Sequence, residues 1–179
     1  MTHAGTKLPA ILRLLALAAA VFLPPAAFAD DYANVNQLLR SGKTADALVA
    51  ADQYLFAKPK DPQMRFLKGV IQSEAGRKED AIATFSKLNE DYPELPEPYN
   101  NLAVLYAEQS QFDKARAALE AAVRANPSYA IAHENLGDVY ARLAGIAYSK
   151  AQQLDSRNTS VQPKLALIRQ LFTPVAKAN

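Results

Sequence analysis

Residues 96–129 read PEPYNNLAVLYAEQSQFDKARAALEAAVRANPSY, and the spacing of key residues in this stretch recurs twice upstream. Prolines stand 34 residues apart, and alanines keep the same interval. A fixed period near 34 residues is typical of stacked helix–turn–helix units, so the sequence predicts contiguous units at 28–61, 62–95 and 96–129. The recurring residues are Pro59, Pro93 and Pro127, and Ala47, Ala81 and Ala115.

Each of these units reads as two helices joined by a turn. In the third unit the first helix covers residues 99–109, and the second, residues 112–125, carries an apolar stripe at helical spacing. Small residues recur at one position of each helix, which lets the two helices pack near the short end of the usual ~8–10 Å separation. In the first helices these small residues are Gly69, Ala103 and Gly137. Gly42 and Gly76 follow the first helix of units one and two, where a positive φ often ends a helix.

These positions resemble the tetratricopeptide repeat family, which has a small residue at position 8, an aromatic at 11, alanine at 20 and proline at 32. The resemblance covers about residues 31–158 and implies an all-α superhelix of paired helices. The second unit departs from the pattern at Lys68 and Gln72, and the first unit matches weakly in its first helix. The third unit matches with Ala103, Tyr106, Ala115, Leu119, Ala122 and Pro127.

The fourth unit departs most from the pattern. Residues 133–140 (HENLGDVY) match the first helix of the repeat. Aligning Leu154 with the usual Leu-Asp-Pro ending, however, leaves the unit about five residues short. The apolar spacing continues in phase as far as Leu154. The sequence therefore predicts a fourth, degenerate repeat fused into one helix over about 130–154. The alternative is a tight bend at Ala144-Gly145.

A last helix is expected at about 161–172, with Ser160 as N-cap and Pro163 in the tolerated first turn. This helix would cover the open end of the array, because terminal units of a solenoid need a cap. The expected organisation is thus a repeat array over 30–158, a capping segment over 159–172 and a flexible tail over 173–179.

The first 29 residues have the layout of a secretory signal peptide. A basic start is followed by ten apolar residues at 14–23, by Pro24-Pro25, and by Ala27-Phe28-Ala29, which fits a small-x-small cleavage site. Ten residues make about 15 Å of helix, half of the ~30 Å hydrocarbon core, and the alternative is a membrane anchor. Because no cysteine is present, a lipid anchor on cysteine is excluded. We expect cleavage after Ala29 and a periplasmic protein without a membrane span.

The charge and the residue types exclude several classes of function. Residues 30–179 carry eighteen basic and eighteen acidic side chains, and this neutral balance does not favour nucleic acid as a partner. Outside the leader His133 stands alone, and there is no cysteine, so we expect no metal, no cofactor and no catalytic set. No glycine-rich phosphate-binding motif occurs.

The resemblance also implies a concave groove lined by the first helices, with positions 2, 5, 9, 12 and 13 of each unit facing a partner. An apolar strip and an acidic far half favour a groove that attracts a basic segment and repels an acidic one. The alternatives are that Tyr32 and Phe66 pack against neighbouring helices and that the acids are an ordinary solvated face. The expected partner-binding residues are Tyr32, Asn36, Leu39, Phe66, Val70, Glu74, Asn100, Val104, Glu108, Glu134 and Asp138.

The functional hypothesis is a non-enzymatic adaptor or scaffold of the cell envelope. Its groove would hold an extended or helical segment of another protein, and a monomer is favoured. Two alternatives stay open at this point: a self-assembling structural element, for which an exposed Leu171-Phe172 would be a contact, and a non-catalytic regulator of an envelope enzyme.

Overall fold

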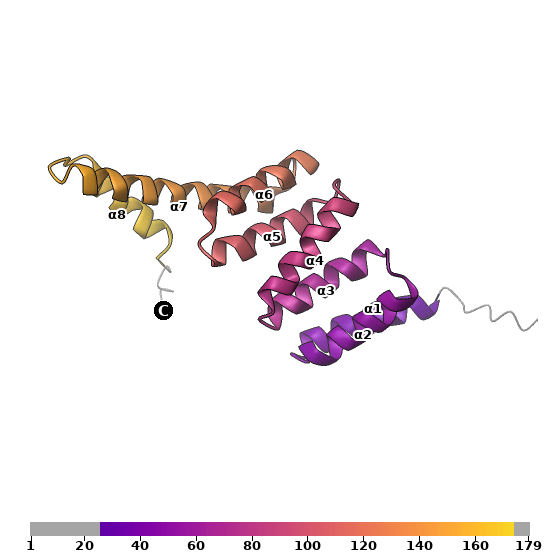
Figure 1. Cartoon of the computed structure of the whole chain (residues 1–179). Helices are drawn as coiled ribbons and strands as arrows, with labels where there is room; N and C mark the ends of the chain where they lie inside the picture. Colours follow the sequence, from indigo (N-terminus) through magenta and orange to yellow (C-terminus); the bar gives the residue numbers. More distant parts are fainter. Residues whose placement is uncertain (1–25, 174–179) are drawn as a thin grey trace, which may run out of the picture.

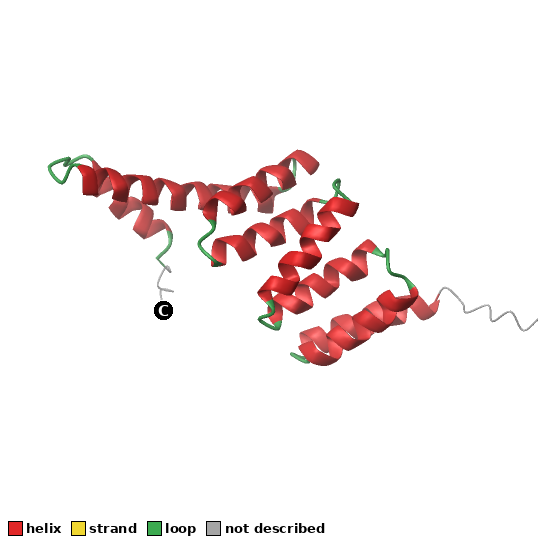
Figure 2. Cartoon of the chain, in the orientation of Figure 1, coloured by secondary structure: helices red, strands yellow, loops and turns green. Residues whose placement is uncertain are grey.

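The structure, a computed structural model, describes residues 26–173, with side chains from residue 31 onward, and within this range it contains helices and no strands (Figure 2). Consecutive helices pack as antiparallel pairs, and the pairs follow one another along an elongated array (Figure 1). The all-α repeat architecture expected from the sequence is confirmed. The helices are α1 (Ala26–Arg40), α2 (Thr44–Ala57), α3 (Pro62–Glu74), α4 (Lys78–Asp91), α5 (Pro96–Glu108), α6 (Phe112–Ala125), α7 (Ala130–Leu154) and α8 (Val161–Leu171).

The recurring prolines end the second helix of each of the first three units, as expected. The helices α2, α4 and α6 each stop two residues before the proline of the unit. Pro62 and Pro96 open α3 and α5 at positions where a missing N–H costs nothing. Gly42 and Gly76 adopt positive φ after the first helices, and Ser110 occupies the equivalent place in the third unit with φ 58°.

The close approach of the two helices in a unit is visible at Gly69 of α3. A Cβ atom added there would lie 2.6 Å from Cε1 of Phe85, a fully buried ring on α4. In the third unit, Ala103 of α5 is buried in one cluster with Ala115 and Leu119 of α6. The small residues of the repeat therefore serve helix packing, as the sequence predicted.

The fourth unit is one continuous helix, and the alternative of a bend at Ala144-Gly145 is not observed. The first half of α7 packs on α5 and α6, and the second half runs past them and pairs with α8 (Figure 1). Because no second helix folds back on the first half, a Cβ atom added at Gly137 would meet nothing within 4 Å. Gly137 thus keeps the small residue of the repeat without the contact that the residue normally serves.

The helix α8 caps the end of the array and buries Val161 and Leu165. Ser160 occupies the N-cap position, as expected, but its side chain makes no capping hydrogen bond, because its backbone is already helical. Its hydroxyl donates to the side-chain oxygen of Asn158 at 2.7 Å. The helix also packs against α7 at Gly145, where an added Cβ would lie 3.4 Å from Ile168.

The expected leader over residues 1–29 lies largely outside the described residues, as does the tail over 173–179, so both boundaries stay predictions. Across residues 26–173, none of the helices combines the length and the apolar character that a bilayer crossing requires.

Two glycines at the same repeat position should respond to alanine in opposite directions. Gly69→Ala should lower the free energy of unfolding by about 1–3 kcal/mol, because the new methyl group collides with the buried Phe85 ring. Gly137→Ala should raise it by about 1 kcal/mol, because alanine is the better helix former and the site is open. Urea unfolding of both variants checks this, and a loss of stability in Gly137→Ala would show that a second helix does pack there.

Replacing Ser110 by glycine should stabilise the protein by roughly 0.5–1 kcal/mol, because a left-handed backbone is unfavourable for any residue with a Cβ. The converse variant, Gly76→Ala, should cost about 1 kcal/mol for the same reason. Its added methyl group meets no atom within 4 Å, so any loss comes from the backbone alone. Thermal unfolding followed by circular dichroism measures both changes, and a Ser110→Gly variant that melts earlier would contradict this account.

Candidate functional site

The residues that the sequence assigned to the partner-binding groove all lie on the first helices of the units. These helices succeed one another along the array, since α3 contacts α5 and α5 contacts α7. The side chains divide into two groups. Those of α1 and α3 are largely engaged in packing, and several of those on α5 and α7 are exposed.

Tyr32 of α1 is held by contacts within the protein. Its ring packs edge-on against Tyr54 of α2 at 5.4 Å between centroids, and its hydroxyl donates to Asp61, the residue that caps α3. Tyr54 donates to the other carboxylate oxygen of Asp61 at 2.9 Å, and the backbone N–H of Met64 donates at 3.1 Å. A single carboxylate therefore joins α1, α2 and α3, which fits the alternative reading that Tyr32 packs against neighbouring helices.

The shared hydrogen bonds change the acidity of all three groups. Burial, followed by the hydrogen bond to Asp61, raises the pKa of both Tyr32 and Tyr54. For Asp61 desolvation acts upward, but the hydrogen bonds from Tyr32, the Met64 amide and Tyr54 outweigh it and leave the pKa lowered. The carboxylate is therefore stabilised in its charged form.

Phe66 and Val70 of α3 are half-buried and pack against the cluster that contains Phe85, with 5.6 Å between the two ring centroids. On α1, Leu39 packs in the cluster around Val35, and the Asn36 side chain donates to its own helix at the Tyr32 carbonyl. The apolar strip expected in the first two units thus belongs mainly to the packing between helices.

Asn100 of α5 is buried and accepts a hydrogen bond from the side chain of Asn135 at 2.8 Å. This bond joins α5 to α7 and aligns the two helices side by side. Asn135 was not among the residues expected from the sequence. The repeat alignment gives the side of the helix on which it lies, but the pairing depends on how α5 and α7 cross.

One group of exposed residues remains on α5 and α7, and we name it the open face. Val104 is 41% exposed and Ile131 is 54% exposed, although both are apolar. Three exposed carboxylates accompany them, and among the ion pairs of residues 31–173 none involves these three. The members of the open face are Glu97, Val104, Ile131, Glu134 and Asp138.

The helical register brings these residues to one side of the two helices. Ile131, Glu134 and Asp138 follow one another at i, i+3 and i+7 on α7, and Glu97 and Val104 are separated by seven residues on α5. The Asn100–Asn135 bond sets the alignment of the helices. Burial, and then the charge of Glu97, raises the pKa of Tyr129 just before α7.

Two further acids of the expected groove behave differently. Glu108 at the end of α5 is paired with Lys78 of α4 at 2.8 Å, so its charge is compensated within the protein. Glu74 is exposed at the end of α3. Of the acids expected in the groove, Glu134 and Asp138 belong to the open face, and Glu74 lies apart from it.

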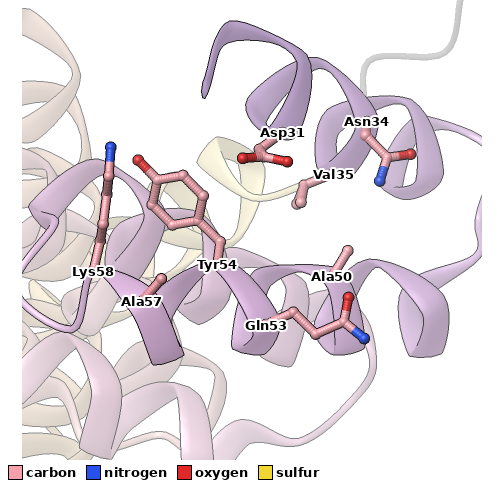
Figure 3. A pocket seen from close by; sticks show the side chains of 8 residues that line it. All are labelled: Asp31, Asn34, Val35, Ala50, Gln53, Tyr54, Ala57 and Lys58. Atoms are coloured by element: carbon pink, nitrogen blue, oxygen red, sulfur yellow. The ribbon is translucent and has the colours of Figure 1, made fainter. Parts of the chain in front are cut away.

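A cavity of about 240 Å³ lies at the other end of the array, between α1 and α2 (Figure 3). It is open to solvent, and none of the residues expected in the groove lines it. Figure 3 shows Asp31 and Val35 facing it from α1 and Ala50 and Tyr54 facing it from α2. The remaining lining residues are Asn34, Gln53, Ala57 and Lys58.

No group of three or more histidine, cysteine or acidic side chains within the described range is placed to hold a metal ion. The imidazole of His133 lies 3.0 Å from the Pro127 carbonyl through Nε2, which ties it to the turn before α7.

The sequence matches the family model described as tetratricopeptide repeat over residues 32–96 and 100–153, and the chain belongs to this family. Over 83 residues it is 34% identical to the tetratricopeptide repeat domain-containing protein PYG7, chloroplastic, of Arabidopsis thaliana. That match covers 44% of this chain, and the chain spans only 28% of the length of the plant protein.

Several solved structures share the fold. PcrH in complex with the chaperone binding region of PopD superposes with a TM-score of 0.60 at 19% identity, covering 68% of this chain and 96% of that chain. MamA gives 0.57 at 23% identity, with 76% and 82% covered. The Yersinia enterocolitica type III secretion translocator chaperone SycD gives 0.59 at 17% identity, with 72% and 89% covered. At these identities the similarity shows the fold alone.

The carboxylate of Asp61 should make stability depend on pH. Because its pKa is lower in the folded protein, its contribution is complete above the unfolded pKa near 4 and is lost as the pH falls through the folded value. Tyr32→Phe removes one hydrogen bond to this charge and should cost about 1–2 kcal/mol at pH 7. The difference from the wild type should shrink at acid pH, where the carboxylate is protonated.

Urea unfolding at pH 7 and at acid pH measures this difference. Tyr92→Phe is the matched control, because the Tyr92 hydroxyl donates to a backbone carbonyl, that of Lys60, and its loss should cost the same at both pH values. A Tyr32→Phe penalty that does not change with pH would show that the hydroxyl does not act through Asp61.

Proposed function

We propose that this member of the tetratricopeptide repeat family is a non-enzymatic adaptor that holds a segment of another protein on its open face. The observation that carries the proposal is the combination of exposed Val104 and Ile131 with three carboxylates that lack ion-pair partners within the described residues. Isolated exposed apolar residues are common, but here they lie on two packed helices and are bordered by charges of one sign.

The chemistry of the open face favours a segment with apolar and basic side chains. Apolar contacts with Val104 and Ile131 would supply affinity, and Glu97, Glu134 and Asp138 would attract Lys or Arg and repel an acidic segment. These carboxylates are exposed, so salt should screen them and weaken binding. An extended strand and a short helix both satisfy this pattern.

Two of the fold neighbours support the general mode of action. The PcrH structure contains the chaperone binding region of PopD, and SycD has been solved with a peptide of the translocator YopD. Both proteins therefore hold a segment of another chain. By analogy of fold, we extend this mode of binding to the present protein, with its own residues on α5 and α7 as the contact surface.

We place this adaptor in the periplasm of a bacterium. Support comes from the basic start, the ten apolar residues at 14–23 and the Ala27-Phe28-Ala29 sequence, which together follow the signal-peptide pattern. Its partner would accordingly be an exported or envelope protein.

Reversing two charges of the open face should release the partner. Glu134→Lys with Asp138→Lys should weaken binding about tenfold or more, because the new charges repel a basic segment. Val104→Asp alone should also weaken binding, because it replaces an apolar contact by a charge that must be desolvated. Affinity capture from envelope extracts identifies the partner of the wild type, and titration calorimetry with that partner then measures the loss.

Matched controls carry the same chemical change elsewhere. Glu79→Lys with Glu94→Lys makes the same change in net charge at exposed sites off the open face, and Phe56→Asp removes an apolar side chain that is 93% exposed on α2. Both should bind normally. Full affinity in the open-face variants, with the helical melting curve intact, would place the binding site elsewhere.

A further inference from the structure

The α7–α8 hairpin carries a second exposed surface at the end of the array. The buried residues of α7 lie in its first half, and beyond the contact with α5 and α6 its second half pairs with α8 (Figure 1). Three leucines in this hairpin remain largely in solvent, because nothing packs over them within the described residues. Leu154 is 75% exposed, Leu167 is 65% exposed and Leu171 is 60% exposed.

Two of these leucines lie on a defined side of the hairpin. The ammonium group of Lys164 lies 5.1 Å from the ring centroid of Tyr148, which brings this side of α8 next to Tyr148 of α7. Leu167 and Leu171 follow Lys164 at i+3 and i+7, so they line the same side of α8. This side therefore combines exposed apolar residues with a basic one.

The hairpin and the rest of the array carry opposite charges. Residues 142–173 contain five basic side chains and one carboxylate, Asp155, whereas residues 31–141 contain sixteen carboxylates and twelve basic side chains. The open face concentrates part of that excess negative charge beside Val104 and Ile131. The hairpin thus has the apolar and basic character that the open face would select. Its basic residues are Arg142, Lys150, Arg157, Lys164 and Arg169.

The two surfaces cannot fold onto each other within one molecule. The open face and the hairpin are both fixed to α7, which is a continuous helix. Leu154 is held about 24 Å from Asp138 along its axis, and α8 runs back along α7 until the Phe172 ring centroid lies 3.5 Å from the Arg142 guanidinium. An unpaired acidic–apolar surface and an unpaired basic–apolar surface on one rigid rod can satisfy each other only between molecules.

We propose that the α7–α8 hairpin of one copy docks on the open face of a second copy, so that the protein associates head to tail. This inference rests on the proposed binding chemistry of the open face. Because the two contact surfaces differ, the association is heterologous, and each added copy leaves one free open face and one free hairpin. Oligomers should therefore grow with protein concentration and shorten with salt.

Sedimentation velocity on the purified protein tests this association with two complementary variants. The hairpin variant is Leu167→Glu with Leu171→Glu, and the face variant is Glu134→Lys with Asp138→Lys. The wild type should associate, and each variant alone should be monomeric, with association weakened about tenfold or more. An equimolar mixture should form a one-to-one heterodimer that grows no further, because it contains one intact hairpin and one intact open face that can pair.

The outcomes separate this proposal from the proposed function. A wild type that stays monomeric at high micromolar concentration overturns head-to-tail association, and partner capture by the open face can still be tested independently. Association of the wild type with no heterodimer in the mixture overturns it as well, because another surface is then in use.

Phe56→Asp is the control variant and should associate like the wild type. Circular dichroism confirms that each variant is folded, and Leu167→Ser with Leu171→Ser replaces the hairpin variant if it is not.

A membrane surface is the competing use of a basic, apolar hairpin. Flotation with phosphatidylglycerol vesicles tests it. If the wild type is monomeric in solution and binds the vesicles, and the leucine variant does not bind them, docking on a second copy is overturned. No vesicle binding, together with salt-sensitive association, supports it.

Discussion

The close contact between a small residue on the first helix of a unit and a bulky residue on its second helix determines the rest of this structure. At Gly69 the backbone approaches the buried Phe85 ring so closely that no side chain fits between them, and Ala103 is buried against the next helix in the same way. Because this contact sets the separation of the paired helices, it also sets where the next pair packs and which side chains face outward. The proline at position 32 of each of the first three units then ends the second helix, so that the next unit can begin.

The fourth unit shows what happens when the small residue is kept and its partner helix is lost. Gly137 faces open space, and α7 continues to Leu154 as a single rod. This rod carries the acidic part of the open face on its first half and supports the basic hairpin on its second half. Because the rod is rigid, the two surfaces keep a fixed arrangement, and the head-to-tail proposal depends on it.

The sequence predicted the units and the fused helix because many independent residues carry the same period, so one poor match such as Gln72 changes little. At Ser160 it predicted the N-cap position but not the absence of a side-chain cap, because the helical backbone of this residue is a product of the turn around Asn158 and not of its own residue type. For the candidate site, repeat positions gave the side of each helix but not what each side chain meets. Tyr32 meets Asp61, Asn100 meets Asn135 and Glu108 meets Lys78, and all three pairs join residues about 30 apart through helix crossing. Which of these side chains are exposed could be learned only from the packed structure. That information reduced the expected groove to the open face.

Continuity of α7 is therefore the claim that most needs a direct measurement. The chain has no cysteine, so spin labels at Glu134→Cys and Leu154→Cys, both exposed, report on this helix alone. Electron paramagnetic resonance distance measurements should give a single narrow distribution near 30 Å, since twenty residues of helix rise about 30 Å. A short distance, below about half that value, would mean that the fourth unit folds back at Ala144-Gly145 as a hairpin. That result would contradict the fixed separation of the two surfaces.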